Sequence, residues 1–210
     1  MPARIVVLAG VNGAGKSSVA GEAIRAGGGE FFDPDAAARQ LLDDSPGMSS
    51  EQANAHAWEI GRRGLERALA KGEFFAIETT LGGNTIPAML IAGARNGAEV
   101  HVSYVGLESP ELHIQRVTSR VSAGGHAIPE SKIRERYETS RKNLVRILPH
   151  LASLWLYDNS ADADPKLGGV PTPTLLLHVS RGKVVAHAAP DRIPSWAKPV
   201  LAAALGSFQA

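Results

Sequence analysis

The sequence has no cysteine, which excludes disulfides, thiolate metal sites and a cysteine nucleophile. It also lacks the run of roughly 20 apolar residues that a membrane-spanning helix needs. The apolar N-terminal stretch is interrupted at Gly10 to Gly15, so it does not read as a secretory signal. We therefore expect a cytoplasmic protein whose chemistry depends on oxygen and nitrogen groups.

The chain has almost no net charge. Its formal charge of +1 offers no overall attraction for nucleic acid or for an anionic membrane, and neither is expected as a partner. Hydrophobic residues make up 44% and charged residues 20%, which is typical of globular proteins. A length of 210 residues is enough for one α/β domain with a full core.

Strand and helix signals alternate along the chain, which predicts a mostly parallel sheet with helices on its faces. We expect strands at 4–9, 28–35, 73–80, 99–107 and 153–160, and helices at 16–26, 36–42, 49–72, 84–96, 109–121 and 129–151. Ser49 or Ser50 is expected to cap the third of these helices and Gly72 to end it. Residues 174–189 predict an antiparallel hairpin that turns at Arg181-Gly182, and the residues after Pro190 carry no clear signal.

Residues 10–17 fit the phosphate-loop pattern G-x-x-x-x-G-K-[ST] without a departure, between a predicted strand and a predicted helix. Glycines let backbone N–H groups surround phosphates at a helix N-terminus. Lys16 is expected to reach the β- and γ-phosphates, and the hydroxyl of Ser17 to bind Mg²⁺. The alternative is a glycine-rich turn with a solvated lysine. The expected ATP-binding residues are Gly10, Val11, Asn12, Gly13, Ala14, Gly15, Lys16, Ser17 and Ser18.

Carboxylates and hydroxyls follow the second and third predicted strands, on the sheet edge where the phosphate loop also lies. The chain has no N-K-x-D stretch that would select guanine, and a kinase needs a base near the acceptor hydroxyl. Asp35 is the preferred base, although it could instead cap the helix that follows it. The residues expected to bind the acceptor are Asp33, Glu78, Thr79, Thr80, His126 and Arg136, although the two threonines could simply be strand residues.

Cations are concentrated in residues 111–150, which hold eight Lys or Arg against four Glu. Arg116 and Arg120 are four residues apart on one predicted helix and face the same way. A glycine-bearing loop and a helix with Arg134 and Arg136 follow, so residues 116–136 are expected to form a lid that brings guanidinium groups to the γ-phosphate. The alternative is a solvated helix face. His126 could be a lid contact or a turn residue.

Five segments together resemble the zeta toxin family: AGVNGAGKSS, FFDPDAAAR, FFAIETTL, RVTSRVSAGGHAIPESKIRERYETSRKNL and WLYDNS. They occur in the family's order between about residues 4 and 160. The resemblance implies a P-loop fold like that of nucleoside monophosphate kinases, here with a C-terminal β-hairpin. A kinase-like core at 1–160 would then be followed by a linker and hairpin at 161–210 of the same domain.

The resemblance also implies an activity, since zeta toxins use ATP and Mg²⁺ to phosphorylate the 3′-hydroxyl of the amino sugar in UDP-N-acetylglucosamine. Asp35 would be the catalytic aspartate, and Lys16 and Ser17 the phosphate-loop residues. Glu78 and Thr80 match positions at the substrate site, and Arg116 or Arg120 matches an arginine that acts on the transferring phosphate. An antitoxin-like protein would be a partner.

Three positions depart from the family pattern. Asp33 stands where the family commonly has Asn, and the loop after the third strand reads Leu81-Gly82-Gly83 where well-studied toxins have an arginine. His126 takes the place of another arginine at the far end of the lid. These departures concern the acceptor and leave ATP-dependent phosphoryl transfer unaffected. The alternatives are a kinase of a nucleoside or an antibiotic, and an NTP-binding regulatory module without kinase activity.

Overall fold

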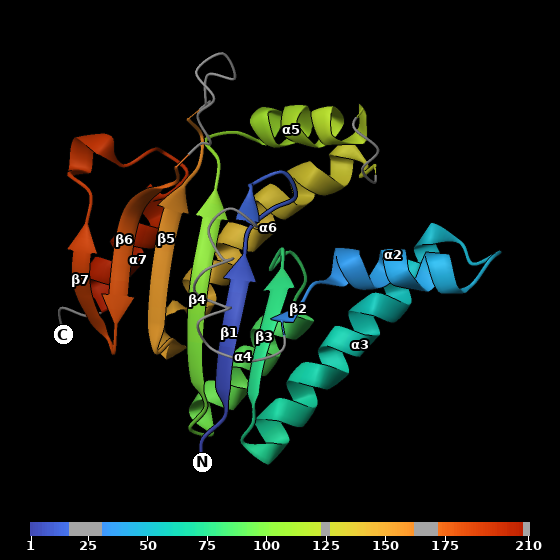
Figure 1. Cartoon of the computed structure of the whole chain (residues 1–210). Helices are drawn as coiled ribbons and strands as arrows, with labels where there is room; N and C mark the ends of the chain where they lie inside the picture. The colour runs from blue at the N-terminus through green and yellow to red at the C-terminus, as the bar shows by residue number, and fades with distance from the viewer. Residues whose placement is uncertain (17–30, 123–126, 162–171, 208–210) are drawn as a thin grey trace.

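A computed structural model describes residues 1–16, 31–122, 127–161 and 172–207 (Figure 1). Beyond Lys16, the helix expected at 16–26 lies outside these residues, as do Ser17, Ser18 and His126.

The described strands form one sheet in the order β2-β3-β1-β4-β5-β6-β7. The first five are parallel, and the last two run antiparallel to their neighbours. Their bounds are β1 Arg4–Ala9, β2 Phe31–Phe32, β3 Phe74–Thr79, β4 Glu99–Gly106, β5 Ser153–Asp158, β6 Thr174–Ser180 and β7 Lys183–His187. β1 therefore lies between β3 and β4, so the loop after it leaves the sheet near its middle (Figure 1).

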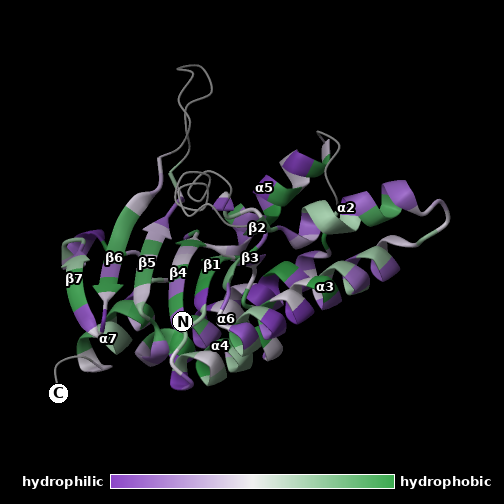
Figure 2. Cartoon of the chain, turned by 60° about the horizontal axis from the view of Figure 1, so that its bottom comes forward, coloured by the Kyte–Doolittle hydropathy of each residue, from purple (hydrophilic) through white to green (hydrophobic). Residues whose placement is uncertain are grey.

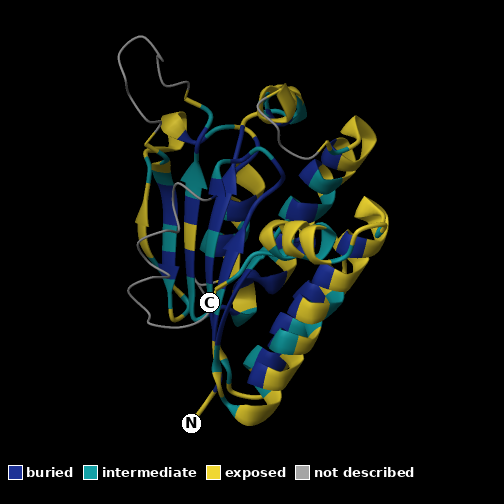
Figure 3. Ribbon diagram, turned by 45° about the vertical axis from the view of Figure 1, so that its right-hand side comes forward, coloured by how far each residue is buried: buried dark blue, intermediate teal, exposed yellow. Residues whose placement is uncertain are grey.

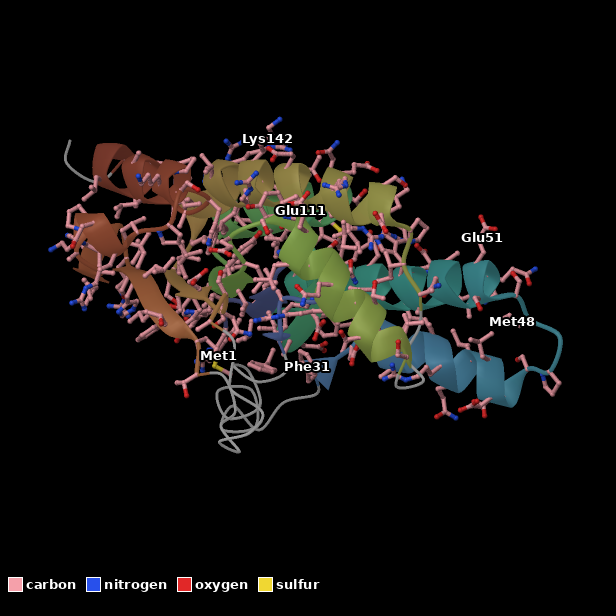
Figure 4. The ribbon with its side chains drawn as sticks, turned by 90° about the horizontal axis from the view of Figure 1, so that it is seen from above. Met1, Phe31, Met48, Glu51, Glu111 and Lys142 are labelled. Carbon is pink, nitrogen blue, oxygen red and sulfur yellow. The ribbon has the colours of Figure 1, made fainter. Side chains whose placement is uncertain are left out.

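The described helices are α2 Pro34–Asp44, α3 Ser50–Lys71, α4 Thr85–Arg95, α5 Pro110–Ser122, α6 Glu130–Ile147 and α7 Lys198–Ser207. α4, α6 and α7 lie behind the sheet in Figure 1, and α5 lies across its upper edge. Seen from above, α2 and α3 run side by side away from the sheet to a tip near Met48 and Glu51 (Figure 4). The alternation of strands and helices predicted this α/β architecture, and it is confirmed.

Local signals placed most helix ends correctly. Ser49 caps α3 in a capping box with Gln52, and Gly72 ends the helix in the left-handed conformation. At α5, the Ser109 hydroxyl accepts a hydrogen bond from the backbone N–H of Leu112, and Pro110 is the first helical residue. The hairpin turns at Arg181-Gly182, as expected, with positive φ angles of 47° and 70°.

The expected strand at 28–35 is wrong in its second half. β2 contains only Phe31 and Phe32, and α2 already begins at Pro34. The N-cap is Asp33, whose Oδ1 accepts hydrogen bonds from the backbone N–H groups of Asp35 (2.9 Å) and Ala36 (3.2 Å). Proline needs no partner for a backbone N–H, so it is tolerated in the first turn and the cap falls one residue before it. Asp35 is therefore not the cap, and its carboxylate is not used to begin the helix.

The core is largely one cluster between the sheet and the helices on one face. Hydrophobic residues, drawn in green, run along strands of the sheet in Figure 2. The central strands are buried, and α3 shows a buried stripe along an otherwise exposed surface (Figure 3). The C-terminal residues, which carried no clear signal, also join this core. Trp196 is 2% exposed, packs 6.2 Å from the ring of Tyr104 and donates from Nε1 to Asp158 Oδ1 at 2.9 Å.

None of the described helices is long and apolar enough to span a membrane.

Trp196→Ala should lower the free energy of unfolding by about 3–5 kcal/mol, because it empties a core position and leaves Asp158 without its indole donor. Trp155→Ala is the matched control, since Trp155 is 36% exposed and its one ring contact among the described residues is a stack on His178, with ring centroids 3.6 Å apart. Its loss should be about 1 kcal/mol. Urea unfolding measures both, and equal losses would contradict the assigned role of Trp196.

Candidate active site

The phosphate loop folds tightly against the end of β4 and against α5. Gly10 has φ +144°, and a Cβ there would lie 2.2 Å from the carbonyl oxygen of Val105. Gly13 has φ +82°, and a Cβ there would lie 2.7 Å from the carbonyl oxygen of His113. Both positions therefore require glycine, for backbone conformation and for space. This is the local geometry that a phosphate cradle needs.

Lys16 is buried, with 7% of its surface exposed, and its ammonium group makes two contacts. Nζ donates to the carbonyl oxygen of Gly10 at 2.8 Å and lies 3.2 Å from Glu78 Oε1. Burial raises the pKa of Glu78, the positive charge of Lys16 partly offsets this rise, and the carboxylates of Asp33 and Asp35 add to it. The phosphate-loop lysine and an acid at the end of β3 thus form one charged pair.

A pocket of about 360 Å³ opens beside this pair. It brings together the end of β1, the carboxyl ends of β2 and β3, and the facing sides of α2, α3 and α6. Among its lining residues are the sequence-predicted Asn12, Lys16, Asp33, Asp35, Glu78, Thr79, Thr80 and Arg136. The expectation that Asp33, Asp35, Glu78, Thr79 and Thr80 lie on the same edge of the sheet as the phosphate loop agrees with this lining.

α5 holds the phosphate loop through a histidine that the sequence did not single out. His113 is 1% exposed, and its Nδ1 lies 2.9 Å from the carbonyl oxygen of Asn12. Because a carbonyl oxygen only accepts, Nδ1 carries the proton and donates it. Burial lowers the pKa of His113 to about 4, so the ring is neutral near pH 7. A neutral donor thus fixes the loop backbone.

α6 supports the loop that follows β3. The Ser140 hydroxyl donates to the carbonyl oxygen of Thr80 at 2.5 Å, and Asn143 Nδ2 donates to those of Leu81 (2.8 Å) and Gly83 (3.0 Å). Leu81 has φ +52°, a left-handed conformation that is unfavourable for its side chain and is maintained by such contacts. α6 therefore holds the loop after β3, which lines one side of the pocket.

Two further side chains bind the phosphate loop from a distance in sequence. Arg136 Nη1 donates to Asn12 Oδ1 at 2.8 Å. Asn159, directly after β5 and 4% exposed, donates from Nδ2 to the carbonyl oxygen of Ala14 at 2.9 Å. The loop is thus held at Asn12 and Ala14 by residues from α5, α6 and the end of β5.

Some predicted site residues are not placed at the pocket. Arg116 and Arg120 lie on α5 and do not line it, and Arg116 Nη2 is 3.4 Å from the carbonyl oxygen of Ala161. Their action on a transferring phosphate stays a prediction. In the described part of the chain, no group of three or more His, Cys, Asp or Glu side chains could hold a metal ion.

The sequence reading missed the α3 wall of the pocket and one residue of α6. Trp58 is 47% exposed, an unusual position for tryptophan, and Arg62 is held by Glu59 and Glu66. The signal that could have found the wall is the i, i+4, i+8 spacing of its polar and aromatic residues on one helix face. Among the missed lining residues are Asn54, Trp58, Arg62 and Lys132.

A sequence profile described as Zeta toxin matches residues 2–152 of the chain. An uncharacterized protein of Haemophilus influenzae is 28% identical over 140 residues, which are 65% of this chain and 94% of that protein.

Two solved structures are similar over most of the chain. The complex AvrRxo1-ORF1:-ORF2 with ATP contains a chain with TM-score 0.63 and 16% identity, covering 100% of this chain. This chain spans 65% of that chain's length. A structure of the PezAT chromosomal toxin–antitoxin system of Streptococcus pneumoniae has TM-score 0.55 and 17% identity, covering 82% of this chain and 74% of that chain. At these identities the likeness establishes the fold, which is the expected kinase-like P-loop fold.

The free energy of unfolding should fall on acidification through His113. The folded protein keeps this ring neutral down to about pH 4, whereas the unfolded chain takes up the proton near pH 6.5. Stability present above pH 6.5 is therefore lost as the pH falls, by about 2 kcal/mol at pH 5. Urea unfolding at pH 7.5 and pH 5.0 measures this loss of unfolding free energy. The loss should be about 2 kcal/mol smaller in His113→Gln than in the wild type. His187→Gln, which changes an exposed histidine, should lose as much as the wild type.

Proposed function

The chain belongs to the zeta toxin family, and on that premise we propose that it transfers the γ-phosphoryl group of ATP to a hydroxyl of a UDP-sugar such as UDP-N-acetylglucosamine. The observation that carries this proposal is the shared pocket, in which Lys16 of the phosphate loop pairs with Glu78 while Asp35 lines the same space. Asp35 thus lies where it could accept a proton from an acceptor bound beside the phosphate loop.

The proposed step begins when Asp35 accepts the proton of the acceptor hydroxyl. The hydroxyl oxygen then forms a bond to the γ-phosphorus, the bond from that phosphorus to the β–γ bridging oxygen breaks, and ADP leaves. Asp35 suits this role because Asp33 is the N-cap of α2, so the Asp35 carboxylate is not used to cap the helix. Lys16 neutralises charge on the phosphates, for which it exchanges its contacts with Gly10 and Glu78.

Mg²⁺ suits the oxygen-bearing side chains of this pocket, and the Ser17 hydroxyl would hold it, with neutralisation of phosphate charge as its contribution. Residues 116–136 would act as a lid, in which Arg116, Arg120 and His126 approach the nucleotide.

The α6 and α3 walls support a nucleotide-bearing acceptor. Lys132 and Arg136 are four residues apart on α6 and line the pocket, which provides positive charge for phosphate groups. Trp58 offers an exposed aromatic surface on α3, suited to stacking on a planar ring. Thr79 and Thr80 add hydroxyls where a sugar could bind. A pocket of about 360 Å³ is in the usual range for small-molecule sites.

A protein partner is part of the proposal. The PezAT structure describes a toxin–antitoxin system, and the AvrRxo1-ORF1 structure is a complex with ORF2. An antitoxin-like chain that inhibits phosphoryl transfer would fit this pattern. Two other functions stay as outcomes of the test: transfer to a nucleoside or antibiotic, and nucleotide binding without a phosphorylated product.

Asp35→Asn should lower kcat by about 100- to 10,000-fold while ATP still binds, because the base is lost and the phosphate loop is intact. The assay incubates the protein with labelled ATP and a panel of UDP-sugars, nucleosides and aminoglycosides, with mass spectrometry of the products. Asp43→Asn is the matched control, since Asp43 is an exposed aspartate on α2 that does not line the pocket. If no member of the panel gains a phosphate with the wild-type protein, the proposed transfer is wrong.

Asp33→Asn should lower KM for a UDP-sugar two- to fivefold and leave kcat nearly unchanged. Asparagine caps a helix as well as aspartate does, so the variant removes only a negative charge, worth about 1 kcal/mol or less at a solvated contact. Steady-state kinetics with a UDP-sugar and with a neutral nucleoside separates the cases. A KM that rises for the UDP-sugar would argue against a diphosphate in this pocket.

A further inference from the structure

We propose that Arg136 is the guanidinium group that binds the transferring phosphoryl group, and that Gly82 leaves the space through which Arg136 reaches it. This inference rests on the proposed phosphoryl transfer and adds a catalytic residue and its structural requirement. The sequence pointed to Arg116 and Arg120 for contact with the transferring phosphate and to Arg136, on the same predicted lid, for contact with the acceptor.

Arg136 contacts the phosphate loop itself. Its Nη1 donates to Asn12 Oδ1 at 2.8 Å, and Asn12 is 7% exposed. Arg136 and Lys16 line the same pocket. The carboxylate residues Asp33, Asp35 and Glu78 line it as well. The guanidinium therefore lies between the loop that would carry the nucleotide and the space that would carry the acceptor. A phosphoryl group in transfer has to pass between these two.

The positive charge of Arg136 is available for a ligand. Lys16 is paired with Glu78, Lys132 with Glu135, and Arg62 with Glu59 and Glu66. In the described part of the chain Arg136 has no ion pair, and its hydrogen bond goes to a neutral amide oxygen. A guanidinium has five N–H donors, so others remain for phosphate oxygens. Among the pocket's cations, this is the arrangement that best suits an incoming anion.

Gly82 sets the path of this side chain. A Cβ at Gly82 would lie 2.8 Å from Arg136 Cγ and 3.3 Å from Thr80 Oγ1, so alanine there would push the arginine out of position. The loop cannot simply move away, because Ser140 and Asn143 of α6 hold it by hydrogen bonds. α6 therefore carries Arg136 and also fixes the loop whose Gly82 leaves space for the Arg136 side chain.

Arg116 and Arg120 differ from Arg136 in their position relative to the pocket. The Cβ of Arg116 lies 3.5 Å from the position of a Cβ on Gly13, so its backbone is close to the loop. Neither arginine lines the pocket in this structure, however. Arg116 and Arg120 on α5 and Arg136 on α6 carry the same charge. Variants of the three therefore compare the effect of position on binding of the γ-phosphate.

Arg136→Gln tests the proposal, since glutamine keeps a donor for Asn12 and removes the charge. Its dissociation constant for the non-hydrolysable β,γ-imido analogue of ATP should rise about tenfold or more, with that for ADP unchanged, because a charge-assisted hydrogen bond to the γ-phosphate is lost. Its kcat should fall about 100-fold or more. Calorimetry with Mg²⁺ present measures binding, and Arg116→Gln and Arg120→Gln are the comparison variants.

Gly82→Ala should reproduce both effects without any change of charge. Gly83→Ala is its matched control, because a Cβ at Gly83 meets nothing within 4 Å, and it should behave as the wild type.

The proposal is overturned if Arg136→Gln weakens ADP and the ATP analogue equally, which would mark Arg136 as a support of the loop alone. It is also overturned if binding and kcat are both unchanged, or if Arg116→Gln gives the γ-phosphate-specific loss in its place. Failure of the proposed function has a different signature: the wild-type protein phosphorylates no acceptor, while the comparison of ADP with the ATP analogue still decides the role of Arg136.

Discussion

The ion pair between the buried Lys16 and the partly buried Glu78 is the contact on which the arrangement of the site depends. It joins the loop after β1 to the end of β3, two neighbouring parallel strands, and places a cation and an acid in one small space. Removing charges from water is costly, and Asp33 and Asp35 nearby raise the pKa of Glu78 further. Such a pair is weak evidence for stability. A phosphate bound at Lys16 would supply the negative charge that Glu78 now provides.

Around this charged pair, most of the supporting contacts are made by neutral groups, and Arg136, which donates to Asn12, is the charged exception. His113 and Asn159 donate to carbonyl oxygens of the phosphate loop, and Ser140 and Asn143 donate to those of the loop after β3. These groups fix the backbone and add no field that would compete with a nucleotide. Buried polar networks of this kind make a local geometry rigid when their groups are paired. The pocket therefore combines a rigid frame with charges that are free to change partners.

Local signals predicted the strands, most helix ends and the phosphate loop, because caps, turns and periodicity depend on residues close in sequence. The same signals were wrong at α2, where Pro34 starts the helix earlier than expected and makes Asp33 the cap. They were silent on the C-terminal residues, because a helix such as α7, with few polar residues, shows no polar face and is ordered by its contact with the core.

By itself the sequence determined the phosphate loop, the α/β order and the set of carboxylates at one edge of the sheet. Only the tertiary structure decided which cation reaches the loop. Arg136 is 124 residues from Asn12, and no local pattern distinguishes it from the other arginines of residues 111–150. That choice depends on how α6 packs against the loop after β3 and on the missing side chain at Gly82. Contacts between residues so far apart arise from the packing of whole elements, which short-range spacing does not encode.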